Sequence, residues 1–505
     1  MSATLPTEPQ KVLTPASSRR AFLKQGAALA AGLAFGLPWF GGCRKTAYEA
    51  ETIWQELSVA LKGTLLRPDY SGFAQKAAPW ALQYAQILPQ AIASCVSKED
   101  VQTCMRWARK HNVPLVARSG GHSYGGYSTT TGLMIDVSPM KQIRYDPVTE
   151  LLHVEGGARN RQVFDAGRSL GLSVTHGRCF EVGVAGLTLG GGIGFDMREN
   201  GYTCDKLVET EVVLADGSSI VCNETAHSDL FWACRGGGGG NFGIHTSFTF
   251  RPFWVQDIAA FQVRWSGGDI TGLLRASQQI VATAPRTVGL KLGVVKSKTG
   301  ASSPLTLYIM GSYHGGNHAQ VEQLLAPMLA LQTPVSTDIR QTSYWEGNTF
   351  LSETGNPEYS HERSRFMKGL LSPAAISTIV STLQAWPGTS KAATWKFFLL
   401  GGAIDDLAPD DTAMIHRGYS MLTSIELEWE DSDSVSTVGR AEQWLDAFHN
   451  QMTPFTSPHS YQNFIDPKET DYLHAYYGAH LQRLREVKRR YDPQNVFHFP
   501  QSIPV

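Results

Sequence analysis

The stretch Arg118-Ser119-Gly120-Gly121-His122-Ser123-Tyr124 places a histidine inside a glycine turn, directly after a predicted strand from Pro114 to Ala117. Because glycine has no Cβ, the backbone N–H groups of such a turn stay open to a ligand. They can bind the pyrophosphate of a dinucleotide, and Arg118 adds a cation beside them. The stretch therefore predicts a dinucleotide-binding loop that also carries a nucleophile, His122.

A second glycine-rich stretch runs from Cys179 to Gly194 and contains six glycines. A backbone of this kind can lie against a flat ring, because few side chains keep the ring away. Taken alone, Cys179 would more often be a small buried side chain than a reactive one.

Gly238 to Gly243 matches the pattern G-x-G-x-x-G, but its surroundings exclude a Rossmann fold. That fold requires a strand before the pattern and a helix after it. Here residues 230–234 are predicted to be helical, and Ile244 to Phe250 alternates like a strand. The sequence thus predicts no NAD site, and it contains no P-loop, zinc or EF-hand motif.

Residues 89–252 alternate short apolar strands with glycine turns and a few helices. Ser97-Lys98-Glu99-Asp100 predicts the start of a helix, with Val101 and Cys104 on its buried face. A further strand is predicted from Gly132 to Val137. This part of the chain has an α+β pattern.

From about Trp254 to Pro454 glycines become fewer and longer strands are predicted. Met421 to Trp429 alternates, with Ile425 on one side and Glu426 on the other. Further strands are predicted at residues 290–295, 305–310 and 395–400, and helices at residues 321–329 and 439–449. We expect a second domain, an antiparallel sheet covered by helices on one side.

From Tyr461 onward, the residue pattern again resembles that of the first domain. A helical stripe is formed by Leu473, Tyr477, Leu481, Leu484 and Val487. The pair Asp492-Pro493 is predicted to end this helix.

Together, the two glycine stretches and the segment that begins Tyr461-Gln462-Asn463 resemble the berberine-bridge-enzyme-like oxidases of the vanillyl-alcohol-oxidase class. The resemblance implies an α+β fold with a PCMH-type FAD-binding domain into which a substrate domain is inserted. It places the FAD domain at residues 46–253 (its core at about 85–253), the substrate domain at 254–455, and a C-terminal segment that completes the FAD domain at 456–505.

The resemblance also implies FAD held by two covalent links, from His122 to the 8α-methyl group and from Cys179 to C6. The residues that it assigns to the cofactor are His122, Cys179, Arg118, Ser119, Gly120, Gly121, Ser123, Val182, Gly183, Gly186, Gly190, Gly191, Gly192, Gly194, Gly243, Ile244 and Asn463. Members of the family with a small residue at the position of Val182 are oxidases, so dioxygen is the expected electron acceptor.

Two residues compete for the role of catalytic base. Glu426 stands where the family has a Glu or Gln facing the flavin, and burial beside an apolar ring would raise its pKa toward neutrality. Tyr461 matches the base of carbohydrate-oxidising relatives, but a phenol with a pKa of about 10 needs groups that stabilise its phenolate. Ile193 and Phe464 replace two tyrosines of the plant-type pattern, which puts a simple transfer of that mechanism in doubt. Tyr124 is assigned to the substrate pocket.

These residues predict an FAD-dependent oxidase that takes hydride from a hydroxyl-bearing small molecule, such as a sugar or oligosaccharide, and reduces dioxygen to hydrogen peroxide. The alternatives are a tailoring oxidase of secondary metabolism and a flavin-binding surface protein without turnover. The 44 basic and 45 acidic residues provide no net field for nucleic acid.

The front of the chain predicts export. Ser18 to Lys24 forms a twin-arginine signature, and the uncharged run from Gln25 to Cys43 follows it. We expect residues 1–45 to be a signal peptide and the protein to be periplasmic, extracellular or lipid-anchored. Phe40-Gly41-Gly42-Cys43 resembles a lipobox in which Cys43 would be lipidated, and ordinary cleavage nearby is the alternative.

Seven cysteines occur, and none has metal-ligand spacing. Apart from Cys43 and Cys179, five remain: Cys95, Cys104, Cys204, Cys222 and Cys234. The alternatives for these five are one or two disulfides in an oxidising compartment or buried free thiols.

Overall fold

A computed structural model describes residues 42–297 and 303–505. The chain divides into two compact units, Met1–Trp54 and Gln55–Val505, and helix α1 occupies Gly42–Ala60. The predicted twin-arginine signature lies outside the described residues. Among the residues that are described, no helix combines the length and the apolar character needed to cross a bilayer.

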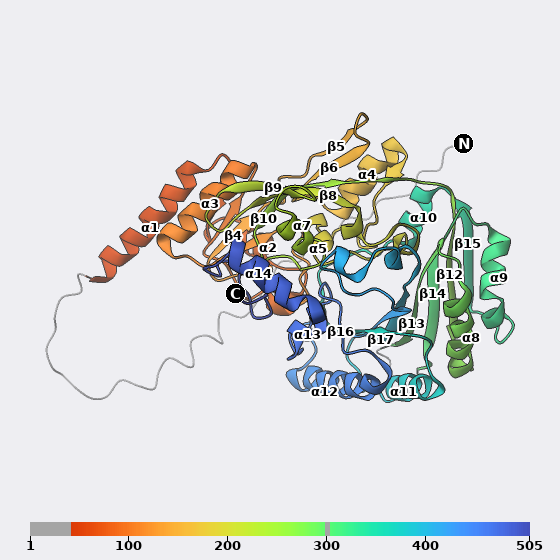
Figure 1. Cartoon of the computed structure of the whole chain (residues 1–505). Coiled ribbons are helices and arrows are strands. Elements are labelled where there is room, and N and C mark those ends of the chain that lie inside the picture. Colours follow the sequence, from red (N-terminus) through yellow and green to blue (C-terminus); the bar gives the residue numbers. More distant parts are fainter. Residues whose placement is uncertain (1–41, 298–302) are drawn as a thin grey trace, which may run out of the picture. The chain divides into compact units, whose positions relative to one another are not determined.

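The first lobe of the second unit contains two main sheets (Figure 1). A four-stranded sheet has the order β1 (Thr64–Leu66), β2 (Ala91–Ser94), β4 (Leu133–Asp136), β3 (Leu115–Arg118). A five-stranded antiparallel sheet has the order β5 (Ile143–Asp146), β6 (Leu151–Glu155), β10 (Ile244–Phe250), β8 (Leu207–Val213), β9 (Ser219–Asn223). Strands β7 (Leu172–Ser173) and β11 (Phe253–Trp254) form a short pair.

Shorter elements connect these strands. They are α2 (Phe73–Ala77), α3 (Lys98–His111), α4 (Asn160–Leu170), α5 (Val184–Leu189), α6 (Met197–Asn200) and α7 (Ser228–Ala233), with the 3₁₀ turns Leu82–Tyr84 and Thr203–Lys206.

Helix α3 positions the first glycine stretch. Its first turn is capped by the Ser97 side chain, which accepts a hydrogen bond from the N–H of Asp100, and it ends at Asn112 in the left-handed conformation. Val101 and Cys104 are fully buried on its inner face, as predicted. The chain then enters β3, which pairs in parallel with β4 and ends directly before the glycine turn.

The second lobe is a seven-stranded antiparallel sheet (Figure 1). Its order is β15 (Ser336–Thr342), β12 (Ile258–Ser266), β14 (Thr306–His314), β13 (Val288–Lys296), β17 (Ala393–Leu399), β18 (Met421–Trp429), β16 (Tyr359–Met367). Its helices are α8 (Ile270–Thr283), α9 (His318–Leu329), α10 (Tyr344–Leu351), α11 (Pro373–Gln384) and α12 (Val435–Met452), with 3₁₀ turns at Gly402–Asp405, Pro409–Asp411 and Thr453–Phe455.

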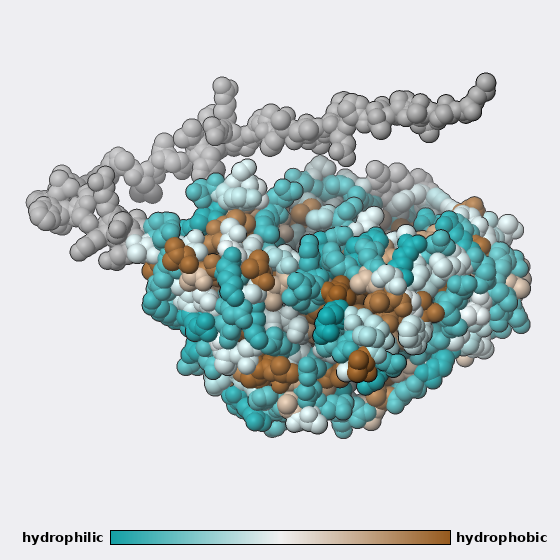
Figure 2. Space-filling view, turned by 90° about the horizontal axis from the view of Figure 1, so that it is seen from above, coloured by the Kyte–Doolittle hydropathy of each residue, from teal (hydrophilic) through white to brown (hydrophobic). Residues whose placement is uncertain are grey.

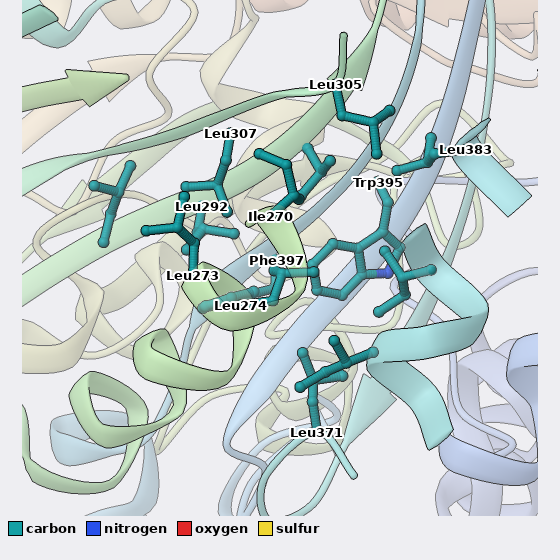
Figure 3. Close-up of a cluster of buried hydrophobic side chains, with 14 of the residues drawn as sticks. Ile270, Leu273, Leu274, Leu292, Leu305, Leu307, Leu371, Leu383, Trp395 and Phe397 are labelled. Atoms are coloured by element: carbon teal, nitrogen blue, oxygen red, sulfur yellow. The ribbon is translucent and has the colours of Figure 1, made fainter. Parts of the chain in front are cut away.

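One face of this sheet forms the largest apolar core. Figure 3 shows Leu273 and Leu274 of α8 packed with Leu292, Trp395 and Phe397 from the sheet. Side chains of α9, α11 and α12 belong to the same cluster. The predicted sheet with helices on one side is therefore confirmed, and β18 has the predicted bounds.

The other face of the sheet packs against the first lobe. Phe366, Phe398 and Leu422, from three neighbouring strands, form a buried cluster with Ile193 and Tyr461. The α+β fold is as predicted. The proposed domain boundaries stay predictions, and all strands from β12 to β18 fall between residues 254 and 455.

The C-terminal segment returns to the first lobe, where α13 (Tyr472–Tyr477) and α14 (Leu481–Tyr491) join the core cluster of β10 and α7 (Figure 1). The single helical stripe predicted here is wrong, because a 3₁₀ turn at Gly478–His480 separates the two helices. Gly478 has a positive φ of 44°, and a Cβ on it would lie 2.9 Å from Ile415. The break therefore falls on a glycine, whose positive φ a residue with a side chain rarely adopts and whose missing Cβ allows Ile415 to approach.

All six cysteines whose side chains are described are free thiols, and five of them are buried. Cys95 and Cys104 lie with their sulfur atoms 3.9 Å apart. Of the two alternatives, the structure shows the buried thiols. The surface face in Figure 2 is mainly hydrophilic, with apolar residues gathered in a few patches.

An ion pair without solvent exposure holds the end of the chain. Lys488 and Asp492 are 2.8 Å apart and both side chains are 0% exposed. Lys488 also donates to the carbonyl of Asn241 at 2.7 Å, and Asp492 accepts the N–H groups of Val496 and Phe497. The pair thus connects α14, the loop before β10 and the last loop of the chain.

We expect Lys488→Met to lower the stability of the fold by about 3–5 kcal/mol, because Asp492 would remain buried without its cation. Arg490→Met is the matched control, since its ion pair with Asp229 is exposed and such pairs contribute about 0–1 kcal/mol. The midpoint of urea denaturation, followed by tryptophan fluorescence, measures both. Equal midpoints for the two variants would contradict this role of the buried pair.

Candidate active site

A cavity of about 1190 Å³ lies in the first lobe, and its wall includes residues of the C-terminal segment. It exceeds the ~300–1,000 Å³ of a typical small-molecule pocket. Its walls come from segments that are far apart in the sequence, within residues 108–130, 177–193, 239–245, 461–465 and 494–500.

Most of the predicted site residues lie on this wall. They are Arg118, Ser119, Gly120, Gly121, His122, Ser123, Tyr124, Cys179, Val182, Gly183, Gly186, Gly243, Ile244, Tyr461 and Asn463. Gly190, Gly191, Gly192, Gly194 and Glu426 are not among the residues that line it.

The two glycine stretches touch each other through their backbones. A Cβ on Gly120 would lie 2.3 Å from the nitrogen of Gly183, and a Cβ on Gly183 would lie 2.4 Å from the nitrogen of Gly120. Neither position therefore accepts a side chain. The contact brings His122 and Cys179, one from each stretch, to the wall of a single cavity.

Arg118 makes its hydrogen bonds to backbone carbonyl groups of neighbouring segments. Its guanidinium donates to the backbone carbonyls of Ser128 and Ala78, each at 2.9 Å, and to that of Lys76 at 3.4 Å. Burial lowers its pKa to about 10, which leaves it charged at neutral pH. The predicted cation beside a pyrophosphate thus serves first to hold the surrounding loops in place.

His122 is half-buried and stacks against Trp80, with the two ring centroids 5.5 Å apart. Burial, assisted by the positive charge of Arg159, lowers the pKa of His122 to about 4. The imidazole is therefore neutral at neutral pH, and a neutral ring nitrogen has the lone pair that a nucleophile needs.

Cys179 has a partner that the sequence did not indicate. Its thiol donates to the Oε2 atom of Glu353 at 3.5 Å. The other carboxylate oxygen, Oε1, accepts from Arg178 and from Lys291, the latter at 2.7 Å. Burial, followed by the charge of Glu353, raises the pKa of Cys179 to about 12.

The second half of the Cys179 stretch has a different role from the predicted contact with a flat ring. The N–H of Gly192 donates to the phenolic oxygen of Tyr461 at 2.9 Å. A Cβ on Gly190 would lie 2.1 Å from the Asn463 side chain. These glycines therefore allow the C-terminal segment to approach, and in this part of the stretch the cavity is lined by Leu187, Leu189 and Ile193 instead.

Tyr461 receives a second hydrogen bond, from the side-chain amide of Asn463 at 3.1 Å. Burial raises the pKa of Tyr461 above its usual range, while the donors Asn463 and Gly192 oppose that shift. The resting side chain is a neutral phenol. Two N–H groups, one from the backbone of Gly192 and one from the side chain of Asn463, thus point at the phenolic oxygen.

The environment of Glu426 differs from the apolar one that we expected. Lys396 lies between two carboxylates, with its Nζ 2.5 Å from Glu426 and 3.1 Å from Glu362. The structure thus gives Glu426 an ion pair where the base prediction required a neighbouring apolar ring.

Tyr124 belongs to a row of aromatic rings on the cavity wall. Its ring lies 5.0 Å from that of Trp80 and 5.4 Å from that of Phe464, and it is nearly parallel to the latter. Trp80 was not predicted, because it precedes the glycine stretch in a segment without a motif. Residues 494–500 and Glu353 were missed for the same reason.

The sequence matches two known family models. A model described as "FAD binding domain" matches residues 89–223, and one described as "Berberine and berberine like" matches residues 460–504. Both matched regions contribute to the cavity wall.

Known proteins are similar over most of the chain. An FAD-linked oxidoreductase of Bacillus subtilis, named YgaK, is 33% identical over 423 residues, which are 82% of this chain and 91% of that protein. A glucooligosaccharide oxidase of Sarocladium strictum is 29% identical over 444 residues, 81% of this chain and 86% of the relative.

Among solved structures, the wild-type BBE-like 1 protein of Physcomitrella patens superimposes with a TM-score of 0.80 at 25% identity, over 90% of this chain and 99% of that one. The glycine loops, the inserted antiparallel sheet and the returning C-terminal segment are thus explained by common descent. The chain belongs to the berberine-bridge-enzyme-like family of FAD-linked oxidoreductases.

Proposed function

We propose that this enzyme oxidises a hydroxyl group of a sugar or oligosaccharide, using FAD bound through both His122 and Cys179, and that dioxygen reoxidises the flavin to give hydrogen peroxide. The observation that carries the proposal is the hydroxyl of Tyr461, which lies on the cavity wall with two N–H donors aimed at its oxygen. The similarity to a glucooligosaccharide oxidase supports the substrate class.

The residues of the cavity fit FAD. Backbone without side chains lines it where Gly120 meets Gly183, and residues 239–245 and 494–500 extend it far enough for a dinucleotide. The two nucleophiles lie on the same wall, and the neutral state of His122 suits attack on an electrophilic carbon. When bound, FAD supplies the acceptor for the hydride.

The protein's own part in the reaction is to hold the substrate and to accept a proton. Tyr461 would take the proton of the substrate hydroxyl as the hydride leaves the adjacent carbon. Gly192 and Asn463 would stabilise the resulting phenolate, because both already donate to this oxygen. Trp80, Tyr124 and Phe464 provide flat apolar surfaces against which a sugar ring can pack.

The choice of dioxygen depends on Val182. This residue lies on the cavity wall three positions after Cys179, and its side chain is small. A small side chain leaves space for dioxygen beside the ring, whereas a larger one would fill it.

The alternative is a tailoring oxidase of secondary metabolism in which Glu426 is the base. The first function is favoured over this one, because Glu426 is paired with Lys396 and does not line the cavity, whereas Tyr461 does.

The proposed location of the enzyme is outside the cytoplasm. It rests on the twin-arginine signature from Ser18 to Lys24 and the uncharged run after it, with Cys43 as the candidate site of a lipid anchor. Replacing both Arg19 and Arg20 by Lys would retain the protein in the cytoplasm if this route is used.

The two covalent links predict a pattern of flavin retention. We expect His122→Ala and Cys179→Ala each to keep FAD on acid-precipitated protein through the remaining link, and the double variant to release all of it. Flavin absorbance of the washed pellet measures this. A double variant that still retains flavin in acid would exclude these two residues as the attachment sites.

The base assignment predicts unequal effects of two substitutions. Tyr461→Phe should slow flavin reduction about 10²–10⁴-fold, since general base catalysis contributes this much. Glu426→Gln should have a far smaller effect. Anaerobic stopped-flow reduction with cellobiose, xylobiose and glucose measures the rates. A fast Tyr461→Phe enzyme together with an inactive Glu426→Gln enzyme would support the alternative.

The oxygen assignment predicts that Val182→Leu slows flavin reoxidation more than flavin reduction. The larger side chain would occupy space beside the ring, while the substrate contacts would remain. Reduced enzyme mixed with air-saturated buffer gives the reoxidation rate, and Val182→Ala is the control in the opposite direction. Three enzymes with equal reoxidation rates would remove the argument for an oxidase.

A further inference from the structure

We propose that Glu353 is the base that accepts the thiol proton of Cys179 while the sulfur bonds to C6 of the flavin. The inference rests on the proposed attachment of FAD through Cys179. It assigns a catalytic role in the maturation of the enzyme to a residue of the substrate lobe, outside the two glycine stretches.

The backbone places Glu353 beside Cys179. Glu353 follows helix α10, and it forms a parallel bridge with Cys179 in which the Glu353 N–H donates to the carbonyl of Arg178 at 3.2 Å. Two residues later, Gly355 has a positive φ of 62°, and a Cβ on it would lie 3.4 Å from the Cβ of Cys179. The segment therefore runs directly along the cysteine.

The two oxygens of the carboxylate have separate partners. Oε1 accepts from Arg178 and from Lys291 of strand β13. Oε2 accepts the thiol hydrogen of Cys179. Arg178 is itself held over the ring of Phe398, with its Cζ 4.6 Å from the ring centroid. The two cations thus fix the orientation of the carboxylate, so that its other oxygen faces the sulfur.

The protonation states of Glu353 and Cys179 decide what their contact can do chemically. Burial alone would raise the pKa of Glu353, but Arg178 and Lys291 outweigh it and hold that pKa well below its usual range. Glu353 is therefore an ionised acceptor at any physiological pH. Cys179, with its pKa raised to about 12, keeps its proton and is a poor nucleophile until that proton is removed.

A carboxylate of low pKa can act here because the acidity of the thiol changes during the reaction. As the sulfur donates its electron pair to a carbon, the S–H group becomes strongly acidic. Its proton can then pass to an acceptor within hydrogen-bond distance, as in general base catalysis. Oε2 of Glu353, at 3.5 Å from the sulfur, is in that position.

The atoms and electrons of the step balance. The S–C6 bond forms, the S–H bond breaks with its proton passing to Glu353, and the hydrogen on C6 leaves as a second proton. Two electrons remain on the flavin, and dioxygen takes them together with two protons to give hydrogen peroxide. Dioxygen is also the acceptor in the proposed turnover, so no further oxidant is needed.

The test follows the two flavin links separately. Full-length protein from riboflavin-limited cells is mixed with FAD in air-saturated buffer, quenched in acid at intervals and digested with trypsin. His122 lies on the peptide 119–141 and Cys179 on the peptide 179–198, so their masses report each link independently. We expect Glu353→Gln to slow flavin attachment to Cys179 about a hundredfold or more while His122 is modified at the wild-type rate.

Glu181→Gln is the matched control. Glu181 is a carboxylate two residues from Cys179, but it pairs with Arg159 and makes no hydrogen bond to the thiol. This variant removes a negative charge of the same size from a position close to Cys179 in the sequence, and we expect wild-type attachment at Cys179.

Attachment at Cys179 that is as fast in Glu353→Gln as in the wild type, or faster, would overturn the proposal, because the thiol would then lose its proton without the carboxylate. A wild type without flavin on Cys179 would overturn the bicovalent attachment itself and this inference with it. If Glu353→Gln loses both links, Glu353→Asp decides: recovery of the Cys179 link supports the base, and continued loss of both links shows a role in folding alone.

Discussion

The backbone contact between Gly120 and Gly183 is the constraint on which the site depends. Each glycine occupies the space that a Cβ of the other would need, so the two stretches can touch only if both positions lack side chains. This contact brings a histidine and a cysteine from separate parts of the chain to one wall. A larger residue at either position would separate the loops and, with them, the two proposed attachment points.

Gly190 and Gly192, which follow the contact between the two stretches, allow the C-terminal segment to come close to the cavity. Tyr461 belongs to the C-terminal segment and lies on the wall of the same cavity as His122. The N–H of Gly192 holds that hydroxyl, and Gly190 leaves space for Asn463. The buried pair of Lys488 and Asp492 then holds the last loop of the chain, which forms another part of the wall. Cofactor loops and catalytic segment are thus positioned by the same run of glycines.

Local patterns predicted those parts of the fold whose stability is local. The cap at Ser97, the strand before His122 and the alternation from Met421 to Trp429 all depend on neighbours within one element, and all were found as expected. The break at Gly478 was missed because the apolar stripe continues on both sides of it, although glycine is a common signal for the end of a helix. Glu353 could not be predicted from local patterns, since its importance comes from a partner brought near by the fold.

The inner face of the second sheet adds an argument about the substrate. Lys396 is neutralised between Glu362 and Glu426, and Lys291 shares Glu353 with Arg178. Glu358 and Glu428 have pKa values raised to about 8 and 7, chiefly by burial and then by the charge of Glu426, so both are at least partly protonated at neutral pH. The charged groups named here are therefore either held in ion pairs within the protein or partly neutralised by protonation. Lys396, Glu362 and Glu426 do not line the cavity, but their charges act on Tyr124 of its wall with opposing signs. The face therefore adds little net charge to the cavity, which suits a neutral polyhydroxy compound better than an ion.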